Sequence, residues 1–393
     1  MSGVGRPPHL SSRLPASLTA NRISEELQRC RVEHVAVTDL TASNPTQVGI
    51  EYPADILDGL ADPAALRYEP HAFGHMRARE AVARDCARRG AEPDPHDVVL
   101  TASTSESYSW LFKLLCNPGD SVLAPAPSYP LFEHLTRLES VELGLYRLEY
   151  HRRWELDVES IRAAPPSTRA LILVSPNNPT GSYVSPRELD DVLAICRERR
   201  WALIADEVFA DYPLEIDHPL TDVASRADVL SFTLGGASKS LGLPQVKLGW
   251  IIAGGTQTVR QPTLHALEHI ADAFLSVGTP VQMAAASLLR DGASVRRAIH
   301  ERVRNNLAAA RTIADRFPSC DVLHAEGGWS LTVRVPATQP EETRVLELLA
   351  TERVLVHPGY FFDFPHEAFV VVSLLPEPAI FADAFERSLR FLR

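Results

Sequence analysis

Short apolar runs alternate with helical patterns along the larger, N-terminal part of the chain. The apolar runs predict buried strands, which we place at residues 98–100, 122–123, 170–174, 202–205 and 229–233. The segments between them repeat apolar residues at helical spacing, at 77–89, 107–116, 131–138 and 186–200. Short apolar strands that alternate with helices are typical of a mostly parallel sheet covered on both faces. The pattern therefore predicts an α/β fold.

The pattern changes toward the C-terminus. Helical patterns around 264–274 and 280–317 are followed by a strand pattern at 331–335, a helical pattern at 341–352 and a strand pattern at 368–375. This order predicts a second, smaller α+β domain. We expect an N-terminal arm that joins the small domain over 1–45, a large domain over 46–275, and the small domain itself over 276–393.

The composition excludes several classes of function. The chain has 393 residues and a formal net charge of -11, whereas a general nucleic-acid binder needs a basic surface. The five cysteines are scattered and form no CxxC pair, which favours reduced thiols. The first residues lack the apolar core of a signal peptide, and no apolar run is long enough to span a membrane. We therefore expect a cytoplasmic protein without nucleic-acid or membrane partners.

Polar residues follow several of the predicted strands. Ser103, Thr104 and Ser105 follow one strand and open a helix. Such a group is often only an N-cap, but hydroxyls and backbone N–H groups at a helix N-terminus also form an anion site. Asn178, in the run NNPTG, follows a second strand, and Asp206 ends a third. Ligands of parallel sheets bind beyond the C-terminal strand ends, so these residues are candidates for one site.

Lys239 follows another predicted strand, in the run GGASKS. A lysine among glycines and hydroxyl residues can be approached closely, and its amine is a nucleophile that forms a Schiff base with a carbonyl. The run also resembles a nucleotide-binding P-loop, but that motif needs a glycine directly before the lysine, and here Ser238 precedes it. A pyridoxal-phosphate enzyme combines such a lysine with a carboxylate and with donors for the phosphate.

Taken in order, these residues resemble the class I/II aminotransferases, the aspartate-aminotransferase-like branch of the fold-type I pyridoxal-phosphate enzymes. The resemblance extends from about Tyr68 to Ser373. It rests on Tyr68, the small-residue group STS, PSYP around Tyr129, NNPTG, DEV and SK…GLP…LGW. The whole series is specific, although no single member is. It implies a seven-stranded type of sheet, bound pyridoxal 5'-phosphate, a homodimer, and transfer of an amino group between an amino acid or amine and a 2-oxo acid.

The resemblance also implies a role for each matching residue. Lys239 is expected to be the Schiff-base lysine and proton shuttle, and Asp206 to pair with the pyridinium nitrogen. Tyr129 is expected to stack on the ring, and Asn178 to bond its phenolic oxygen. The groups expected to hold the phosphate are Ser103, Thr104, Ser105, Ser238, Lys247 and, from the neighbouring subunit, Tyr68. The resemblance implies no metal in this site.

Three positions depart from the family pattern. Phe209 stands where a tyrosine is usual, so one hydrogen bond to the phenolic oxygen is missing. Lys247 replaces an arginine, which keeps the charge but loses the bidentate fork. Val371 replaces the arginine that binds the substrate's carboxylate. Either the substrate lacks an α-carboxylate there or another group binds it, and the candidates for that group are Asn44, His357 and Tyr360.

Three other interpretations stay open from the sequence. The run from His265 to His269 fits H-x-x-E-H, an inverted zinc-protease motif, although no third ligand accompanies it. A regulator that keeps this fold for sensing is disfavoured because both Lys239 and Asp206 are present and no DNA-binding segment is visible. Elimination, decarboxylation or oxidation with the same cofactor is the closest alternative, because one fold hosts many chemistries.

Overall fold

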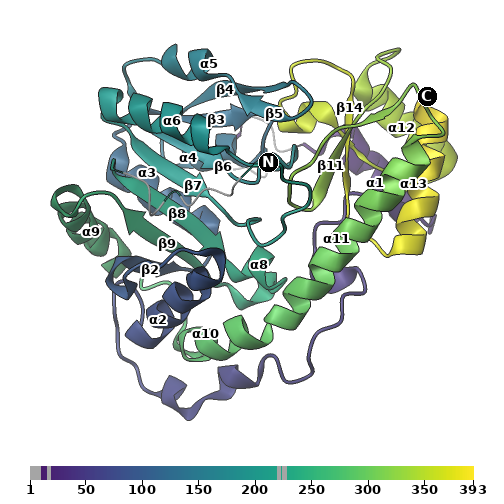
Figure 1. Cartoon of the computed structure of the whole chain (residues 1–393). Helices are drawn as coiled ribbons and strands as arrows, with labels where there is room; N and C mark the ends of the chain where they lie inside the picture. Colours follow the sequence, from purple (N-terminus) through teal and green to yellow (C-terminus); the bar gives the residue numbers. More distant parts are fainter. Residues whose placement is uncertain (1–9, 16–18, 219–222, 224–227) are drawn as a thin grey trace, which may run out of the picture.

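A mostly parallel sheet forms the centre of the larger part of the molecule in the computed structural model (Figure 1). Among the residues that the structure describes, 10–15, 19–218, 223 and 228–393, this sheet has eight strands. In spatial order they are β2 (Val98–Thr101), β9 (Gly249–Gly254), β8 (Ser231–Gly236), β7 (Ala202–Asp206), β6 (Thr168–Val174), β3 (Ser121–Ala126), β4 (Glu142–Tyr150) and β5 (Trp154–Leu156). The predicted α/β fold class is confirmed. The short β5 adds one strand to the seven-stranded type by antiparallel pairing with β4.

The direction of the strands decides where their ends lie. β8, β7, β6, β3 and β4 run parallel to one another. β9 is antiparallel to both β8 and β2, so β2 again runs in the direction of β8. The C-terminal ends of β2, β8, β7, β6 and β3 therefore meet at the same edge of the sheet.

Alternate residues of the central strands enter two different cores, because neighbouring side chains of a strand point to opposite faces. Leu171 and Leu173 pack with α6 (Pro186–Arg199) and α5 (Val158–Arg162). Ile172 packs on the other face, with α3 (Thr104–Leu115) and α9 (Gln257–Asp272). Helices on both faces explain why these strands read as continuous apolar runs.

A smaller antiparallel sheet stands beside the large one, on the right in Figure 1. Its strands are β10 (Asp321–Val322), β11 (Ser330–Arg334), β14 (Phe369–Ser373) and β13 (His357–Pro358). The accompanying helices are α11 (Ala293–Ala314), α12 (Glu341–Glu352) and α13 (Pro378–Leu392). The long helix α11 runs from α10 (Thr279–Asp291), beneath the large sheet, to the small sheet.

The N-terminal segment joins this smaller part. Helix α1 (Arg22–Val32) contacts α12, and β1 (Thr38–Asp39) pairs in parallel with β12 (Val354–Leu355). Residues 1–9 and 16–18 of the predicted arm lie outside the described residues. The limits 1–45, 46–275 and 276–393 remain a prediction. No helix among the described residues has the length and apolar character needed to cross a bilayer.

The observed elements differ from the predicted ones at several ends. Helix α3 begins at Thr104 and α9 at Gln257, both earlier than expected, and the pattern at 280–317 is divided into two helices around Gly292. Strand β4 was not predicted, because most of its residues are exposed or only half-buried and the apolar signal is weak. Strand β9 was not predicted either, because its sequence GWIIAG continues the motif around Lys239.

Gly181 joins the loop after β6 to the smaller part of the molecule. Its carbonyl accepts hydrogen bonds from the backbone N–H groups of Glu326 and Gly327, at 3.1 and 2.9 Å. Its φ is +73°, and a Cβ there would lie 2.7 Å from the Gly327 carbonyl oxygen and 2.9 Å from the Ala325 Cβ. Both the backbone conformation and the close approach therefore require glycine.

We expect Gly181→Ala to lower the free energy of unfolding by more than the roughly 1–3 kcal/mol typical of one strained residue, measured by urea denaturation. Gly119→Ala is the matched control, because Gly119 has a φ of +86° with no atom near its missing Cβ. The control isolates the cost of the backbone conformation. Equal losses in the two variants would show that the contact with Gly327 has no energetic consequence.

Candidate active site

Five strand ends bring polar or aromatic side chains to one cavity of about 350 Å³. The cavity lies at the edge of the sheet where β2, β8, β7, β6 and β3 end, as expected for a ligand site of a parallel sheet. The predicted site residues that line it are Ser103, Thr104, Ser105, Tyr129, Asn178, Asp206, Ser238 and Lys239. The structure thus brings together eight residues that are widely separated along the chain.

Lys239 lies in the short helix α8 (Ala237–Ser240) directly after β8. Its Nζ lies 5.2 Å from the centre of the Trp329 ring and 5.5 Å from that of Phe209, which are cation–π distances. Burial lowers the pKa of Lys239, and the charge of Asp206 opposes this shift. A lowered pKa leaves a larger fraction of the amine neutral near neutral pH, and the neutral form is the one that acts as nucleophile and proton acceptor.

Asp206 is buried at the end of β7, with two hydrogen-bond donors on its carboxylate. The Tyr108 hydroxyl donates to Oδ2 at 2.8 Å, and the Val208 backbone N–H donates to Oδ1 at 3.2 Å. Burial raises the pKa of Asp206, while these two hydrogen bonds and the charge of Lys239 lower it. Burial also raises the pKa of Tyr108, so this hydroxyl stays a donor. Tyr108 was missed in the sequence, where it reads as one more core aromatic of α3.

The serine and threonine group forms the start of helix α3. Ser103 is the N-cap, and its side chain accepts a hydrogen bond from the Glu106 N–H at 3.2 Å. The carboxylate of Glu106 accepts from the Ala102 N–H at 2.7 Å. Thr104 and Ser105 occupy the first turn, where backbone N–H groups have no partner within the helix. The N-cap interpretation is therefore confirmed for Ser103. All three residues also line the cavity, and the anion site stays a prediction.

The two neighbouring asparagines have different surroundings. Asn177 is buried, and its amide donates to the Pro127 carbonyl and the Thr180 hydroxyl. Asn178 lines the cavity, and the Ser330 hydroxyl donates to its Oδ1 at 2.9 Å. This bond orients the amide so that its N–H groups remain available for a ligand. Ser330 was also missed, because it comes from β11 in the smaller part of the molecule and has no motif of its own.

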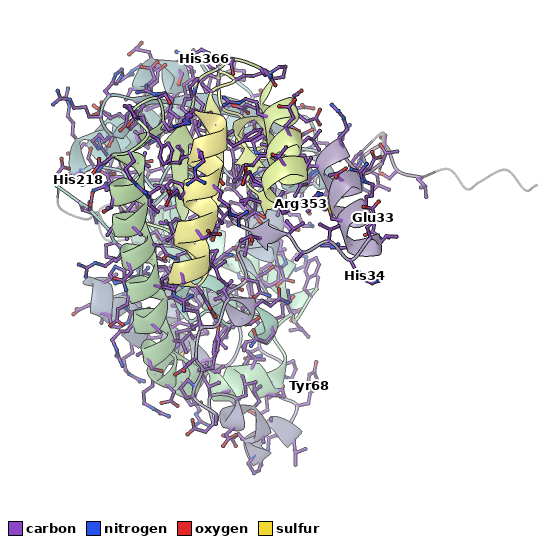
Figure 2. All side chains as sticks on the ribbon, turned by 90° about the vertical axis from the view of Figure 1, so that its right-hand side faces the viewer. Glu33, His34, Tyr68, His218, Arg353 and His366 are labelled. Carbon is purple, nitrogen blue, oxygen red and sulfur yellow. The ribbon has the colours of Figure 1, made fainter. Side chains whose placement is uncertain are left out.

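Two predicted site residues lie outside the cavity. Tyr68 is 74% exposed and stands at the lower right of the molecule in Figure 2. Lys247 is exposed, has a φ of +58°, and is not among the residues that line the cavity. Tyr68 was expected to act in a neighbouring subunit, so its position in a single chain does not test that role.

Val371 stands where the family pattern has an arginine for the substrate's carboxylate. Val371 lines the cavity, and its direct partner across the strand pair β13–β14 is His357, which lines the cavity too. Burial lowers the pKa of His357, and the charge of Asp39 opposes the shift. Asn44 and Tyr360 are not among the lining residues, so of the three proposed clamps only His357 faces the cavity. The described lining residues include no arginine.

The H-x-x-E-H run lies on the exposed face of α9. The closest ring nitrogen of His265 and carboxylate oxygen of Glu268 are 4.0 Å apart, and both side chains are largely exposed. Among the described residues, no group of three potential metal ligands includes His265, Glu268 or His269. The structure therefore gives the zinc-protease interpretation no third ligand.

The family model for aminotransferase class I and II matches residues 54–377. The chain belongs to this family. A glutamate-pyruvate aminotransferase of Escherichia coli is 26% identical over 380 residues, which cover 94% of each chain. An alanine aminotransferase of Mycobacterium bovis is 27% identical, over 94% of this chain and 89% of its own. A solved aminotransferase from Escherichia coli has a TM-score of 0.87 at 26% identity and covers 98% of both chains. The predicted family and the predicted aminotransferase activity are confirmed.

We expect the Tyr108→Phe variant to lose aminotransferase activity at a higher pH than the unmodified chain when the solution is acidified. The variant removes a hydrogen bond that lowers the pKa of Asp206, so this carboxyl takes up a proton at higher pH as the solution is acidified. A hydrogen bond to a charged group is worth roughly 1.5–3 kcal/mol, which corresponds to about 1–2 pH units. The acidic limb of the kcat/KM profile should move upward by that amount.

Tyr146→Phe is the matched control, because the Tyr146 hydroxyl is also buried but donates to the Ile172 carbonyl, away from the cavity. That variant should leave the acidic limb in place. Equal profiles for Tyr108→Phe and the unmodified chain would contradict the role given to this hydroxyl.

Proposed function

We propose that this aminotransferase works with pyridoxal 5'-phosphate attached through Lys239, and that it binds its substrate without an arginine clamp. The observation that carries the proposal is the meeting of Lys239 and Asp206 in one cavity beside the start of α3. An amine, a carboxylate and an anion-binding helix start are the three protein groups that this cofactor needs.

The donor set fits the cofactor at each of its polar positions. The phosphate would be held by the α3 start at Ser103 to Ser105 and by the Ser238 hydroxyl. The ring nitrogen would face Asp206, and the phenolic oxygen would accept from the Asn178 amide. The aromatic face of Tyr129, half-exposed on the cavity wall, supplies a surface for stacking. Lys247 would add positive charge only if its exposed side chain turns toward the phosphate.

When bound, the cofactor supplies an electron sink for charge that develops next to the substrate's amino-bearing carbon. Lys239 Nζ would carry the proton between the substrate carbon and the cofactor, which needs an amine that is neutral for part of the cycle. Burial supports that role, because it lowers the pKa of Lys239. Asp206 would keep the ring nitrogen protonated by charge pairing. The rings of Trp329 and Phe209 lie beside Nζ and give it apolar surroundings on those sides.

A homodimer is the proposed working unit. The exposed position of Tyr68 supports it, because a tyrosine that serves its own cavity would be turned inward rather than 74% exposed. In the dimer, Tyr68 would contribute its hydroxyl to the phosphate site of the other subunit. We also propose a cytoplasmic protein, which the five free cysteines support.

The proposed substrate has a large apolar group and does not depend on an ionic clamp for an α-carboxylate. Val371 and Val372 take up the region where the family's arginine would stand, and Phe361 and Phe362 continue the apolar wall. His357, the cross-strand partner of Val371, offers a polar contact there as a neutral imidazole. Relatives named for alanine and glutamate-pyruvate transamination therefore do not indicate the substrate of this chain.

Covalent attachment of the cofactor can be assigned among only three lysines, Lys113, Lys239 and Lys247. We expect borohydride reduction followed by peptide mapping to place the cofactor on Lys239. Lys239→Ala should abolish the attachment and lower kcat by at least about 100-fold, because it removes both the nucleophile and the proton carrier. Lys113→Ala is the control, since this lysine is exposed and pairs with Glu139. A label on Lys113 or Lys247 would overturn the assignment.

The substrate proposal predicts poor activity with small, simple amino acids. A charge-assisted clamp is worth roughly 1.5–3 kcal/mol, so its absence should place kcat/KM for alanine and aspartate about 10- to 100-fold below that for an arylalkyl amine. His357→Ala should weaken whatever carboxylate binding remains, whereas Tyr360→Phe, outside the cavity, should not. Fast turnover of alanine that persists in His357→Ala would refute the proposal. If it disappears in that variant, His357 is the clamp.

A further inference from the structure

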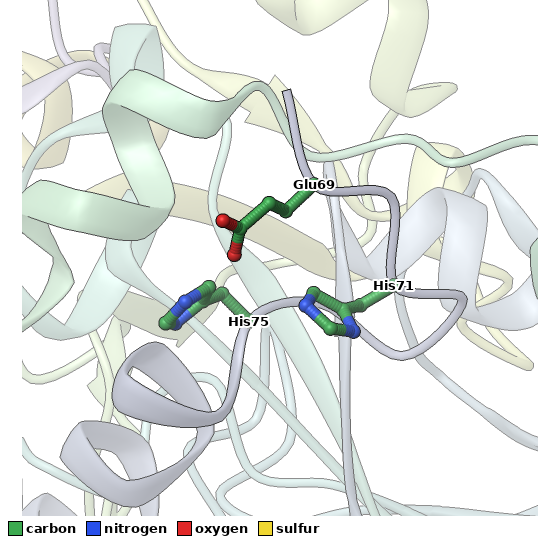
Figure 3. A group of neighbouring side chains, drawn as sticks. All are labelled: Glu69, His71 and His75. Atoms are coloured by element: carbon green, nitrogen blue, oxygen red, sulfur yellow. The ribbon is translucent and has the colours of Figure 1, made fainter. Parts of the chain in front are cut away.

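Three metal-ligating side chains converge just after Tyr68, outside the active-site cavity. A carboxylate oxygen of Glu69 and a ring nitrogen from each of His71 and His75 all lie within 4.8 Å of one another (Figure 3). The two imidazole rings meet edge to face, with 5.6 Å between their centres. We propose that these three residues form a binding site for Zn²⁺ or a similar first-row transition-metal ion. The sequence missed it, because E-x-H-x-x-x-H is not a familiar metal motif.

The local backbone holds the three side chains on one side of a turn. The Gly74 N–H donates to the His71 carbonyl at 2.9 Å, and Gly74 has a φ of +86°. The chain therefore reverses between the two histidines. The His75 N–H donates to the Gln282 side chain of α10, which fixes the second histidine to the body of the molecule. The site thus lies on a turn that is fixed by hydrogen bonds and leads into helix α2 (Met76–Cys86).

The ligand types favour a transition metal over Mg²⁺ or Ca²⁺. Two imidazoles and one carboxylate suit Zn²⁺, whereas the hard cations prefer oxygen ligands. Tetrahedral bonds of about 2.0–2.2 Å place ligand atoms about 3.3 Å apart, so small side-chain rotations close the site around an ion. Within the single chain Glu69 and His71 are exposed and His75 is half-buried, so packing within the chain does not hold the first two side chains in place. The fourth position stays open for water or another donor.

Two existing interactions compete with the metal. Arg67 lies 3.5 Å from the Glu69 carboxylate, but both side chains are exposed and such pairs are weak. His75 Nδ1 accepts a hydrogen bond from the Arg77 N–H at 3.2 Å and so caps α2. A metal on Nδ1 takes this lone pair, and a metal on Nε2 places a proton on Nδ1. In both cases coordination replaces the cap, and protons compete with the metal at acid pH.

The proposed metal site lies next to Tyr68, so a bound ion would affect the orientation of that residue. Glu69 directly follows Tyr68, and a small cavity of about 30 Å³ is lined by both residues together with His71 and Gln282. A bound ion would tie the segment from Tyr68 to α2 into one orientation. This consequence rests on the proposed dimer, in which Tyr68 reaches the other subunit's cofactor. The binding of the metal does not rest on it.

The test is zinc binding to the chelator-treated, cofactor-loaded full-length protein, measured by isothermal titration with ZnCl₂ at neutral pH. We expect one ion per chain. His71→Ala should weaken binding by more than about 100-fold, since loss of a direct ligand exceeds the 10- to 100-fold typical of outer partners. His71→Cys should restore most of it, because thiolate is a zinc ligand. His75→Asn should lose the metal but keep the helix cap, since asparagine is a good N-cap.

His265→Ala is the matched control, because His265 is exposed and lines a surface hollow together with His71. It should leave the affinity for zinc unchanged. Binding that disappears in His265→Ala would place the ion on α9 instead, and binding that survives His71→Ala would remove His71 from the site. The absence of stoichiometric binding would overturn the proposal. None of these readouts uses transamination, so their failure is distinct from a failure of the proposed function.

Discussion

The site depends on holding a half-buried amine and a buried carboxylate in one cavity. Removing either charge from water costs several kcal/mol. The chain offsets this cost with hydrogen bonds to the carboxylate and with aromatic rings beside the amine. Asp206 is compensated by Tyr108 and by a backbone N–H. Lys239 is compensated by the faces of two aromatic rings. The opposing pKa shifts of the two residues are the result, because burial disfavours both charged forms and each charge supports the other.

The backbone of α8, which carries Lys239, is held by hydrogen bonds from side chains of other elements. The Tyr212 hydroxyl donates to the Lys239 carbonyl at 2.6 Å, and Arg296 Nε donates to the Ser240 carbonyl at 3.0 Å. Arg296 in turn lies 3.5 Å from the carboxylates of Asp85 and Asp211. These residues come from distant elements, so α8 is fixed by α11, α2 and the loop after β7 together. A short helix of four residues needs this support, because it has few hydrogen bonds of its own.

The sequence predicted five strands of the large sheet and eight residues of the cavity lining for the same physical reason. Buried parallel strands read as apolar runs, and the polar residue that ends such a run must lie at the sheet edge. Asp206 and Asn178 were found in this way. Tyr108 and Ser330 were not, because a hydroxyl on a core-facing residue becomes meaningful only when its acceptor on another element is known. The cluster at Glu69 was invisible for a related reason: a turn, not a helical or strand period, brings its members together.

The two largest departures from the family pattern change the cavity in the same direction. Phe209 lacks the hydroxyl that a tyrosine would add, and its ring packs against Trp329 at 5.3 Å. Val371 lacks the guanidinium, and the paired His357 is held toward its neutral form. Each change removes a polar group from the wall, and a less polar wall strengthens every remaining electrostatic interaction. The Lys239 and Asp206 charges therefore act on one another more strongly than they would beside an arginine. A substrate with a carboxylate would have to give up the hydration of that group in this setting in addition to that of its amino group, whereas an amine without a carboxylate would give up only the latter.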